Sequence, residues 1–181
     1  MAQSPGLAPM TAPYGVQVVY GALPRAIMDA GPTFAARAEL AAIKAALPFV
    51  QRKLALATPS GATGLARMSV TAELSLGTPS SGFSGFVGYG GMPSLYMGHV
   101  EHGTHPHWPP IAALAYWAAR KFGYPVGSPE AKRAGYLVAR KISRVGTKGQ
   151  HMVEKTADAN RAQTQRIMAG AALRVFHDMG R

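Results

Sequence analysis

Four of the six histidines in this 181-residue chain stand at positions 99, 102, 105 and 107, and the acid Glu101 lies among them. Imidazole and carboxylate groups are good zinc ligands, and a catalytic zinc site needs three such ligands and a water. The spacing matches no standard zinc site. On the strand expected here His99 and Glu101 share one face, whereas His102 points to the other. The open alternatives are a metal site and a hydrogen-bonded corner or subunit contact, and the spacing favours the second.

Glu101 has a more specific interpretation. It ends the expected strand and precedes Gly103 and Thr104, so its carboxylate can accept hydrogen bonds from loop N–H groups or pair with an arginine. In a ring of subunits that arginine could come from a neighbour, with Arg67 and Arg144 as candidates. The alternative is a solvated carboxylate at a turn. Gly103 indicates a tight backbone and so favours the structural role.

The remaining motifs do not indicate catalysis. The chain has no cysteine, which excludes disulfides, thiolate nucleophiles and thiolate metal sites. Residues 146–149 lack the spacing of a P-loop, and the glycine-rich residues 85–91 follow a strand without opening a helix. No nucleophile–base–acid order stands out. We therefore expect a protein that is not an enzyme and uses no cofactor or metal, with Trp108, Tyr116 and Trp117 in the core or an interface.

The charge is strongly basic and unevenly placed. The net charge is +11, and residues 120–148 carry eight Lys or Arg against one acid, Glu130. Such an excess suggests a polyanionic neighbour, either nucleic acid or an acidic protein surface, and the alternative is a solvated helix face. The side chains expected to contact DNA or an acidic partner are Lys132, Arg133, Arg140, Lys141, Arg144 and Lys148. No interleaved aromatic residues or helix-turn-helix motif support base readout.

The elements that position these residues follow from hydrophobic periodicity. Residues 15–21, 68–76, 83–89 and 95–101 read as strands, the last three as a meander. Helices are expected over 33–57 (kinked or split at Pro48), from Pro109-Pro110 to Gly123, from Ser128 to Gly146, and over 152–179. The expected buried residues are Ile111, Leu114, Ala115, Ala118 and Phe122 in the second helix, and Ala134, Leu137, Val138 and Ile142 in the third.

These elements predict an α+β fold: an antiparallel sheet, a meander of 3–5 strands, packed by an N-terminal helix and two or three C-terminal helices. We expect one domain over residues 14–181, preceded by a flexible arm at 1–13 that is rich in Ala, Pro and Gly. No apolar run is long enough to cross a membrane. The N-terminus has no basic segment followed by an apolar one, so we expect synthesis in the cytoplasm without export.

Three segments, in this order, resemble one known family. Residues 58–70 (TPSGATGLARMSV) resemble its "aP…TG.L..Si" signature, and residues 96–104 (YMGHVEHGT) resemble its "Ya.yvE.GT" signature. Residues 146–152 (GTKGQHM) look like its late "G…qPF" element, although His151-Met152 stands where Pro-Phe is usual. The family is that of small neck or tail-completion proteins of long-tailed bacteriophages. The resemblance covers roughly residues 33–160, and residues 1–30 have no counterpart in it.

The resemblance implies a structural virion protein that joins head to tail, or completes the upper end of the tail, by forming an oligomeric ring. It implies six copies and contacts with a tail terminator or tail tube and with head-side connector proteins. It also allows contact between the basic surface and genome DNA in the ring's lumen, and it involves no membrane. The residues expected at subunit or partner interfaces are Tyr96, His99, Glu101, Thr104, His105, His107 and Trp108. A non-specific nucleic-acid-binding module and a metal-dependent hydrolase are the alternatives.

Overall fold

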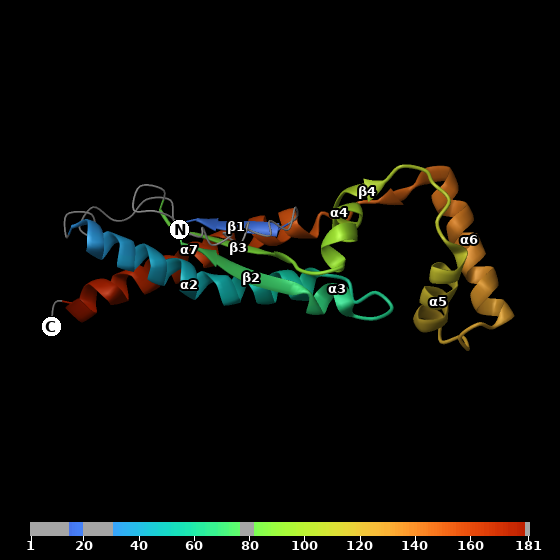
Figure 1. The fold of residues 1–181 in the computed structure, drawn as a ribbon, viewed down its shortest axis with the longest axis horizontal. Helices are drawn as coiled ribbons and strands as arrows, with labels where there is room; N and C mark the ends of the chain where they lie inside the picture. The colour runs from blue at the N-terminus through green and yellow to red at the C-terminus, as the bar shows by residue number, and fades with distance from the viewer. Residues whose placement is uncertain (1–14, 20–30, 77–81, 180–181) are drawn as a thin grey trace, which may run out of the picture.

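The computed structural model describes residues 15–19, 31–76 and 82–179, and the expected arm at 1–13 lies outside them. The fold is α+β, as predicted. The elements are β1 (Gly15–Val19), α2 (Pro32–Ala57), α3 (Leu65–Met68), β2 (Val70–Ser75), β3 (Ser84–Tyr89), α4 (Pro93–His102), β4 (Gly103–Thr104), α5 (Ile111–Phe122), α6 (Pro129–Val145), β5 (Thr147–Lys148) and α7 (Met152–Met179). Figure 1 shows an elongated molecule in which the paired helices α5 and α6 stand apart from the rest.

The main sheet is antiparallel and has the strand order β1-β3-β2. Its central strand, β3, places Gly85 opposite both Val18 and Leu74. A Cβ atom built on Gly85 would lie 2.6 Å from a methyl carbon of Leu47, so this glycine lets α2 approach the sheet closely. The core lies between this face of the sheet and the helices α2 and α7.

The two long helices run beside each other and cover one side of the sheet (Figure 1). The rings of Phe34 on α2 and Phe176 on α7 pack edge to face, with their centroids 5.8 Å apart. Pro48 lies inside α2, which continues to Ala57, so of the two predicted alternatives, a kinked or a split helix, the split is wrong. The side chain of Pro48 is exposed, whereas Leu47 and Val50 on either side are buried.

The prediction of a strand over residues 95–101 is also wrong, because these residues belong to α4. Pro93 stands in the first turn of this helix, where proline is tolerated. Pro93, Met97 and Glu101 are spaced by four, so a helix places all three on one buried face. The third strand of the sheet is β1, which comes from the N-terminal part of the chain.

Candidate functional site: a helical hairpin on a two-stranded arm

The hairpin of α5 and α6 is joined to the body by a short arm, made of β4 paired antiparallel with β5. Backbone approach across the arm is so close that a Cβ atom on Gly103 would overlap the carbonyl oxygen of Thr147, and one on Gly146 would overlap that of Thr104. The hydroxyls of Thr104 and Thr147 lie 2.9 Å apart, and the Thr147 N–H donates to Thr104 Oγ1 at 3.2 Å. Two chain segments thus hold the hairpin in place rather than one loose linker.

Glu101 fixes the base of this arm. It is 4% exposed, and its carboxylate accepts hydrogen bonds from the backbone N–H groups of Val153 and Glu154, at the start of α7. Its carbonyl oxygen accepts from the His151 N–H at 3.0 Å. One of the two structural roles expected for Glu101 was acceptance from loop N–H groups, whereas the N–H groups found belong to the first turn of α7. The other was pairing with arginine, and neither ion pair found among the described residues involves Glu101.

The other residues expected at an interface are exposed or half-buried. Tyr96 and His99 are exposed on α4, Thr104 is half-buried on β4, and His105 and His107 are exposed on the segment that leads to α5. His107 Nδ1 lies 3.0 Å from the carbonyl oxygen of His105. Glu101 differs from them because it is buried within the chain itself. In the described part of the chain, no three His, Asp or Glu residues are grouped so that they could hold a metal ion.

The two helices of the hairpin pack through small side chains. The buried residues are Ala115, Ala118 and Ala119 on α5 and Ala131, Gly135 and Ala139 on α6. A Cβ atom on Gly135 would lie 2.6 Å from the backbone nitrogen of Ala115, so the helix backbones nearly touch there. The Ser128 hydroxyl accepts from the Ala131 N–H at 3.2 Å and caps α6, as its sequence predicted.

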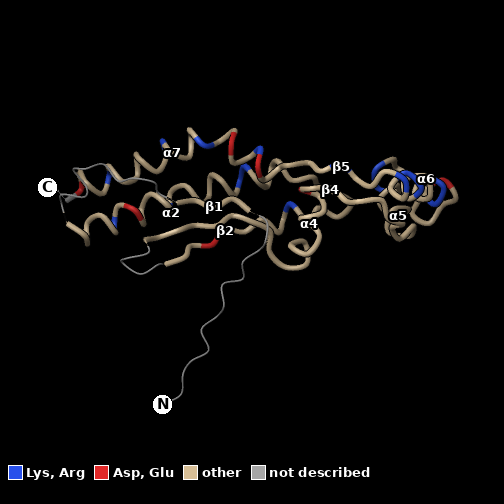
Figure 2. Tube along the Cα trace, turned by 90° about the horizontal axis from the view of Figure 1, so that it is seen from above, with Lys and Arg blue, Asp and Glu red and all other residues tan. Residues whose placement is uncertain are grey.

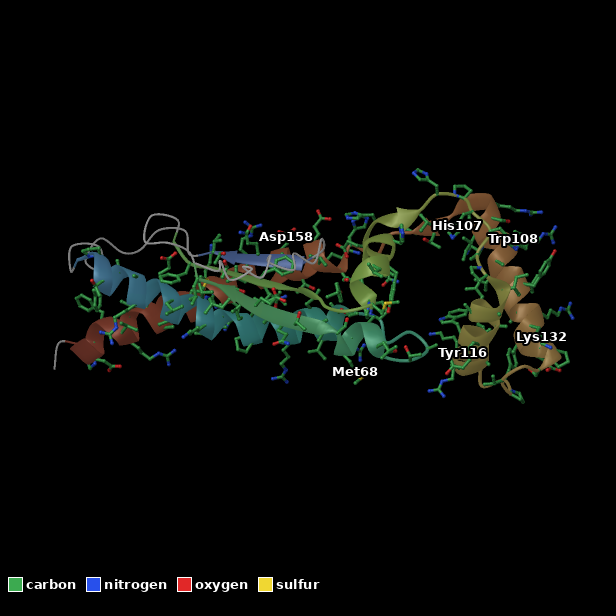
Figure 3. All side chains as sticks on the ribbon, viewed as in Figure 1. Met68, His107, Trp108, Tyr116, Lys132 and Asp158 are labelled. Atoms are coloured by element: carbon green, nitrogen blue, oxygen red, sulfur yellow. The ribbon has the colours of Figure 1, made fainter. Side chains whose placement is uncertain are left out.

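Because small residues fill the interface, the large apolar side chains of the hairpin remain outside. Leu137 and Phe122, both predicted to be buried, are each 53% exposed. Val126, Tyr136 and Val145 are exposed as well. Trp108, labelled in Figure 3, lies on the segment between the arm and α5. Its ring packs against Tyr136 of α6 with centroids 6.0 Å apart. The sequence signal for this arrangement is the spacing of four between the small residues Ala131, Gly135 and Ala139.

The cations of α6 share this outward surface. Figure 2 shows Lys and Arg gathered on the hairpin, at the end of the molecule away from α2 and the C-terminal part of α7. All six side chains predicted to contact DNA or an acidic partner are exposed: Lys132, Arg133, Arg140, Lys141, Arg144 and Lys148. None of them takes part in the ion pairs found within the described residues, which are His151–Glu154 and Arg161–Asp158. The surface therefore combines apolar side chains with unneutralised positive charge.

A second polar cluster lies at the end of α2. The hydroxyl of Thr58, which is fully buried, donates to the Leu54 carbonyl at 2.7 Å and lies 2.8 Å from the Tyr89 hydroxyl. Burial raises the pKa of Tyr89, the hydrogen bond to Thr58 opposes that shift, and the charge of Glu101 adds to it. Arg67 Nε and Nη2 both donate to the Thr58 carbonyl. The cluster ties the loop after α2 to the sheet and to α3.

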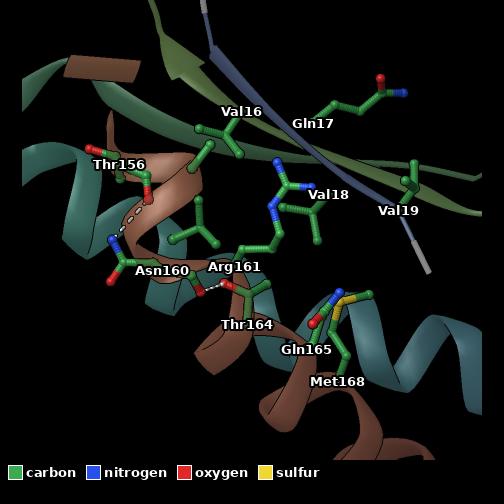
Figure 4. Close-up of a pocket in the computed structure, with 12 residues that line it drawn as sticks. Val16, Gln17, Val18, Val19, Thr156, Asn160, Arg161, Thr164, Gln165 and Met168 are labelled. Atoms are coloured by element: carbon green, nitrogen blue, oxygen red, sulfur yellow. Dashed lines mark hydrogen bonds between the residues drawn. The ribbon is translucent and has the colours of Figure 1, made fainter. Parts of the chain in front are cut away.

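A groove between β1 and α7 is another concave feature of the described chain (Figure 4). Val16, Val18 and Met168 form its apolar part, and Asn160 and Arg161 are among the polar residues that line it. The hydrogen bonds drawn there connect residues within α7. No carboxylate or histidine lines the groove, so its described lining offers no group for acid–base chemistry at neutral pH.

None of the helices in the part of the chain that the structure describes is long and apolar enough to cross a membrane. Comparison of the chain with protein-family models, with curated proteins and with solved structures finds no match.

Proposed function

We propose that this chain is a structural subunit of a tailed-bacteriophage virion, a neck or tail-completion protein that joins head to tail by forming a ring. The observation that carries the proposal is the hairpin. It stands away from the body on a two-stranded arm and has exposed apolar and aromatic side chains. Leu137, Tyr136 and Val145 are exposed on the outside of this helix pair, and a neighbouring protein that packed against them would bury them.

The segments that carry the family resemblance support this proposal by their positions. Residues 96–104 and 146–152 form the base of the arm together, since β4 pairs with β5 and Glu101 binds the start of α7. Met152, which stands where the family has Phe, is 4% exposed and belongs to the core. The resemblance thus falls on residues that position the hairpin.

A ring also needs two different surfaces on each subunit, because head-to-tail contacts join unlike patches. The helices α3 and α4 pack on each other and provide a second apolar surface, with Met68, Met92 and Leu95 each at least 73% exposed. Tyr96, one of the predicted interface residues, is 43% exposed on the same helix, α4. We propose that the hairpin of one subunit contacts this α3–α4 surface of the next. The ring would then contact the tail tube or terminator on one side and the head connector on the other.

The mass of the full chain in solution, measured by multi-angle light scattering, tests the proposal. We expect a ring, or a monomer that assembles only on the ends of isolated tail tubes. Leu137→Ser should abolish that assembly. Leu173→Ser is the matched control, because Leu173 on α7 is 54% exposed and Leu137 is 53% exposed. A monomer that ignores tubes, or equal effects of the two substitutions, would contradict the proposed joining role.

The unneutralised cations on α6 support a second candidate function, non-specific binding of nucleic acid by the hairpin's outer surface. Such binding weakens steeply with salt, because each neutralised phosphate releases condensed counterions. The measurement is the slope of the logarithm of the DNA affinity against the logarithm of the salt concentration. Replacing Arg140 and Arg144 by Gln should reduce that slope by about 2 if both contact phosphates. A slope that stays unchanged would remove this candidate.

A further inference from the structure

A hollow of about 640 Å³ lies between the hairpin and the body, on the side of α5 that faces away from α6. The loop at residues 59–62 forms one wall, and Trp117, Arg120 and Lys121 of α5 form the opposite wall. Arg67 on α3 and Gln150 beyond β5 complete the lining. Residues from three separate parts of the sequence therefore meet here, and the arm determines the distance between the walls.

Arg67 is held in place on the body side. Its Nε and Nη2 atoms donate to the Thr58 carbonyl at 3.1 and 2.9 Å, and Thr58 is itself fixed by its buried hydroxyl. These bonds use one side of the guanidinium and leave the Nη1 donors for a ligand. An arginine whose orientation is already set loses less conformational freedom when it binds an anion.

The positive charges that line the hollow are not neutralised by an acidic side chain in its lining. Arg67, Arg120 and Lys121 line it, and no Asp or Glu is among its lining residues. The ion pairs found in the described chain include none of these three cations. Like charges brought together from two parts of a fold repel one another unless an anion lies between them.

We propose that this hollow binds a phosphodiester group of a nucleic-acid strand, with the adjoining base against the indole ring of Trp117. Guanidinium groups match the oxygens of phosphate in geometry and charge, and aromatic side chains beside such a site give bases a surface for stacking. Trp117 is half-buried and packs edge to face against Phe122, with centroids 5.9 Å apart, which fixes its ring. The site does not depend on the proposed joining role, and α5 separates it from the outer surface of α6 (Figure 1).

The chain contains a natural reporter for this site, because Trp108 and Trp117 are its two tryptophans. In full-length Trp108→Phe protein the fluorescence reports on Trp117 alone. We expect oligothymidylate to quench this fluorescence, and inorganic phosphate to compete only at concentrations at least about tenfold higher. Quenching by phosphate ion but not by the oligonucleotide would overturn the proposal in favour of a small-anion site. If poly-glutamate bound with the same affinity as oligothymidylate, the preference for phosphate would be overturned.

Two variants connect the signal to the hollow. Arg120→Gln with Lys121→Gln, in the Trp108→Phe background, should weaken oligothymidylate binding by about tenfold or more, and this variant leaves the Thr58 network intact. Arg67→Gln should weaken binding by a similar factor, with circular dichroism as the check that the fold persists. Arg166→Gln with Arg174→Gln removes the same charge from exposed positions on α7 and should change the affinity by less than about twofold. Equal losses in the α5 and α7 double variants would show general charge attraction and overturn the assignment.

Discussion

The carboxylate of Glu101 accepts the backbone N–H of Val153 through both of its oxygens, each at 3.1 Å. Val153 lies in the first turn of α7, whose N–H groups have no partner within the helix. Glu101 lies in the last turn of α4, 52 positions before Val153 in the sequence. This one contact therefore closes the loop that contains the arm and the hairpin, and a negative charge at a helix N-terminus is favourable there.

Substitution of Glu101 should destabilise the body. We expect Glu101→Ala to lower the free energy of unfolding by about 2 kcal/mol, because buried N–H groups lose a charged acceptor. Glu101→Gln keeps an acceptor oxygen and should cost about 1 kcal/mol. Urea unfolding followed by circular dichroism measures both. Glu73→Gln, at an exposed position on β2, is the control and should stay within about 0.5 kcal/mol of the parent. If the Glu101 variants match this control, the cap does not form in solution.

His151 provides a separate test of the same corner. Its φ angle is +49°, a region that a side chain makes unfavourable and that proline cannot adopt. His151→Pro introduces the residue that the resembled family has there, yet it should destabilise the protein by about 3 kcal/mol, since it also removes the N–H donor to Glu101. His151→Gly relieves the backbone and should be neutral or stabilising by about 1 kcal/mol. Thermal unfolding distinguishes them, and a stable proline variant would mean that this turn has a different conformation.

Local signals in the sequence identified much of this fold. The alternation over residues 68–76 predicted β2, and Ser128-Pro129-Glu130 predicted the start of α6, because a strand's period and a helix cap depend on neighbouring residues. The strand prediction over residues 95–101 was wrong because a short apolar run fits either a strand or a helix. The spacing of four from Pro93 to Glu101 distinguishes the two, since it places these residues on one face of a helix.

The candidate site was less predictable, since periodicity shows that a helix has an apolar face but not what covers that face. We expected Leu137 to be buried from the hydrophobic pattern of the helix, whereas Gly135 and its small neighbours form the contact. The strands β4 and β5 have two residues each, which is too short for any periodic signal. The hollow joins Arg67 to Trp117 and to other residues 50 or more positions away, so no sequence window contains it.

The raised pKa of Tyr89 predicts a loss of stability in alkali. A phenol whose pKa is higher in the folded state binds its proton more tightly there, so its contribution is fully present below the unfolded value of 10.0. As the pH rises above that value, Tyr89 ionises first in the unfolded chain. Its contribution to the free energy of unfolding then decreases until the pH reaches the pKa of Tyr89 in the folded state. Tyr89→Phe should therefore flatten the fall of the urea midpoint above about pH 10. Tyr116→Phe changes an exposed ring and is the control; identical slopes in the two variants would contradict the assignment.

Gly135 makes the close packing of the hairpin testable. Alanine stabilises a helix by about 1 kcal/mol relative to glycine. Gly135→Ala would therefore stabilise α6 if the helix stood alone. In the hairpin, however, the new Cβ atom would lie 2.6 Å from the backbone nitrogen and 2.8 Å from the Cα of Ala115. Backbone atoms cannot rotate away as a flexible side chain can, so the two helices must separate. We expect a net destabilisation of about 1 to 3 kcal/mol, together with faster hydrogen exchange in α5 and α6.

The matched control is Gly170→Ala on α7, where a new Cβ atom meets nothing within 4 Å. The same chemical change should stabilise the protein there by about 1 kcal/mol, because only the helix preference of alanine acts. If the change in the free energy of unfolding has opposite signs at the two glycines, the helices of the hairpin are in backbone contact in solution. Stabilisation at both positions would mean that α5 and α6 are farther apart than this packing requires. The large side chains now outside, Leu137 and Phe122 among them, could then turn inward, and the exposed surface on which the proposed assembly depends would not exist.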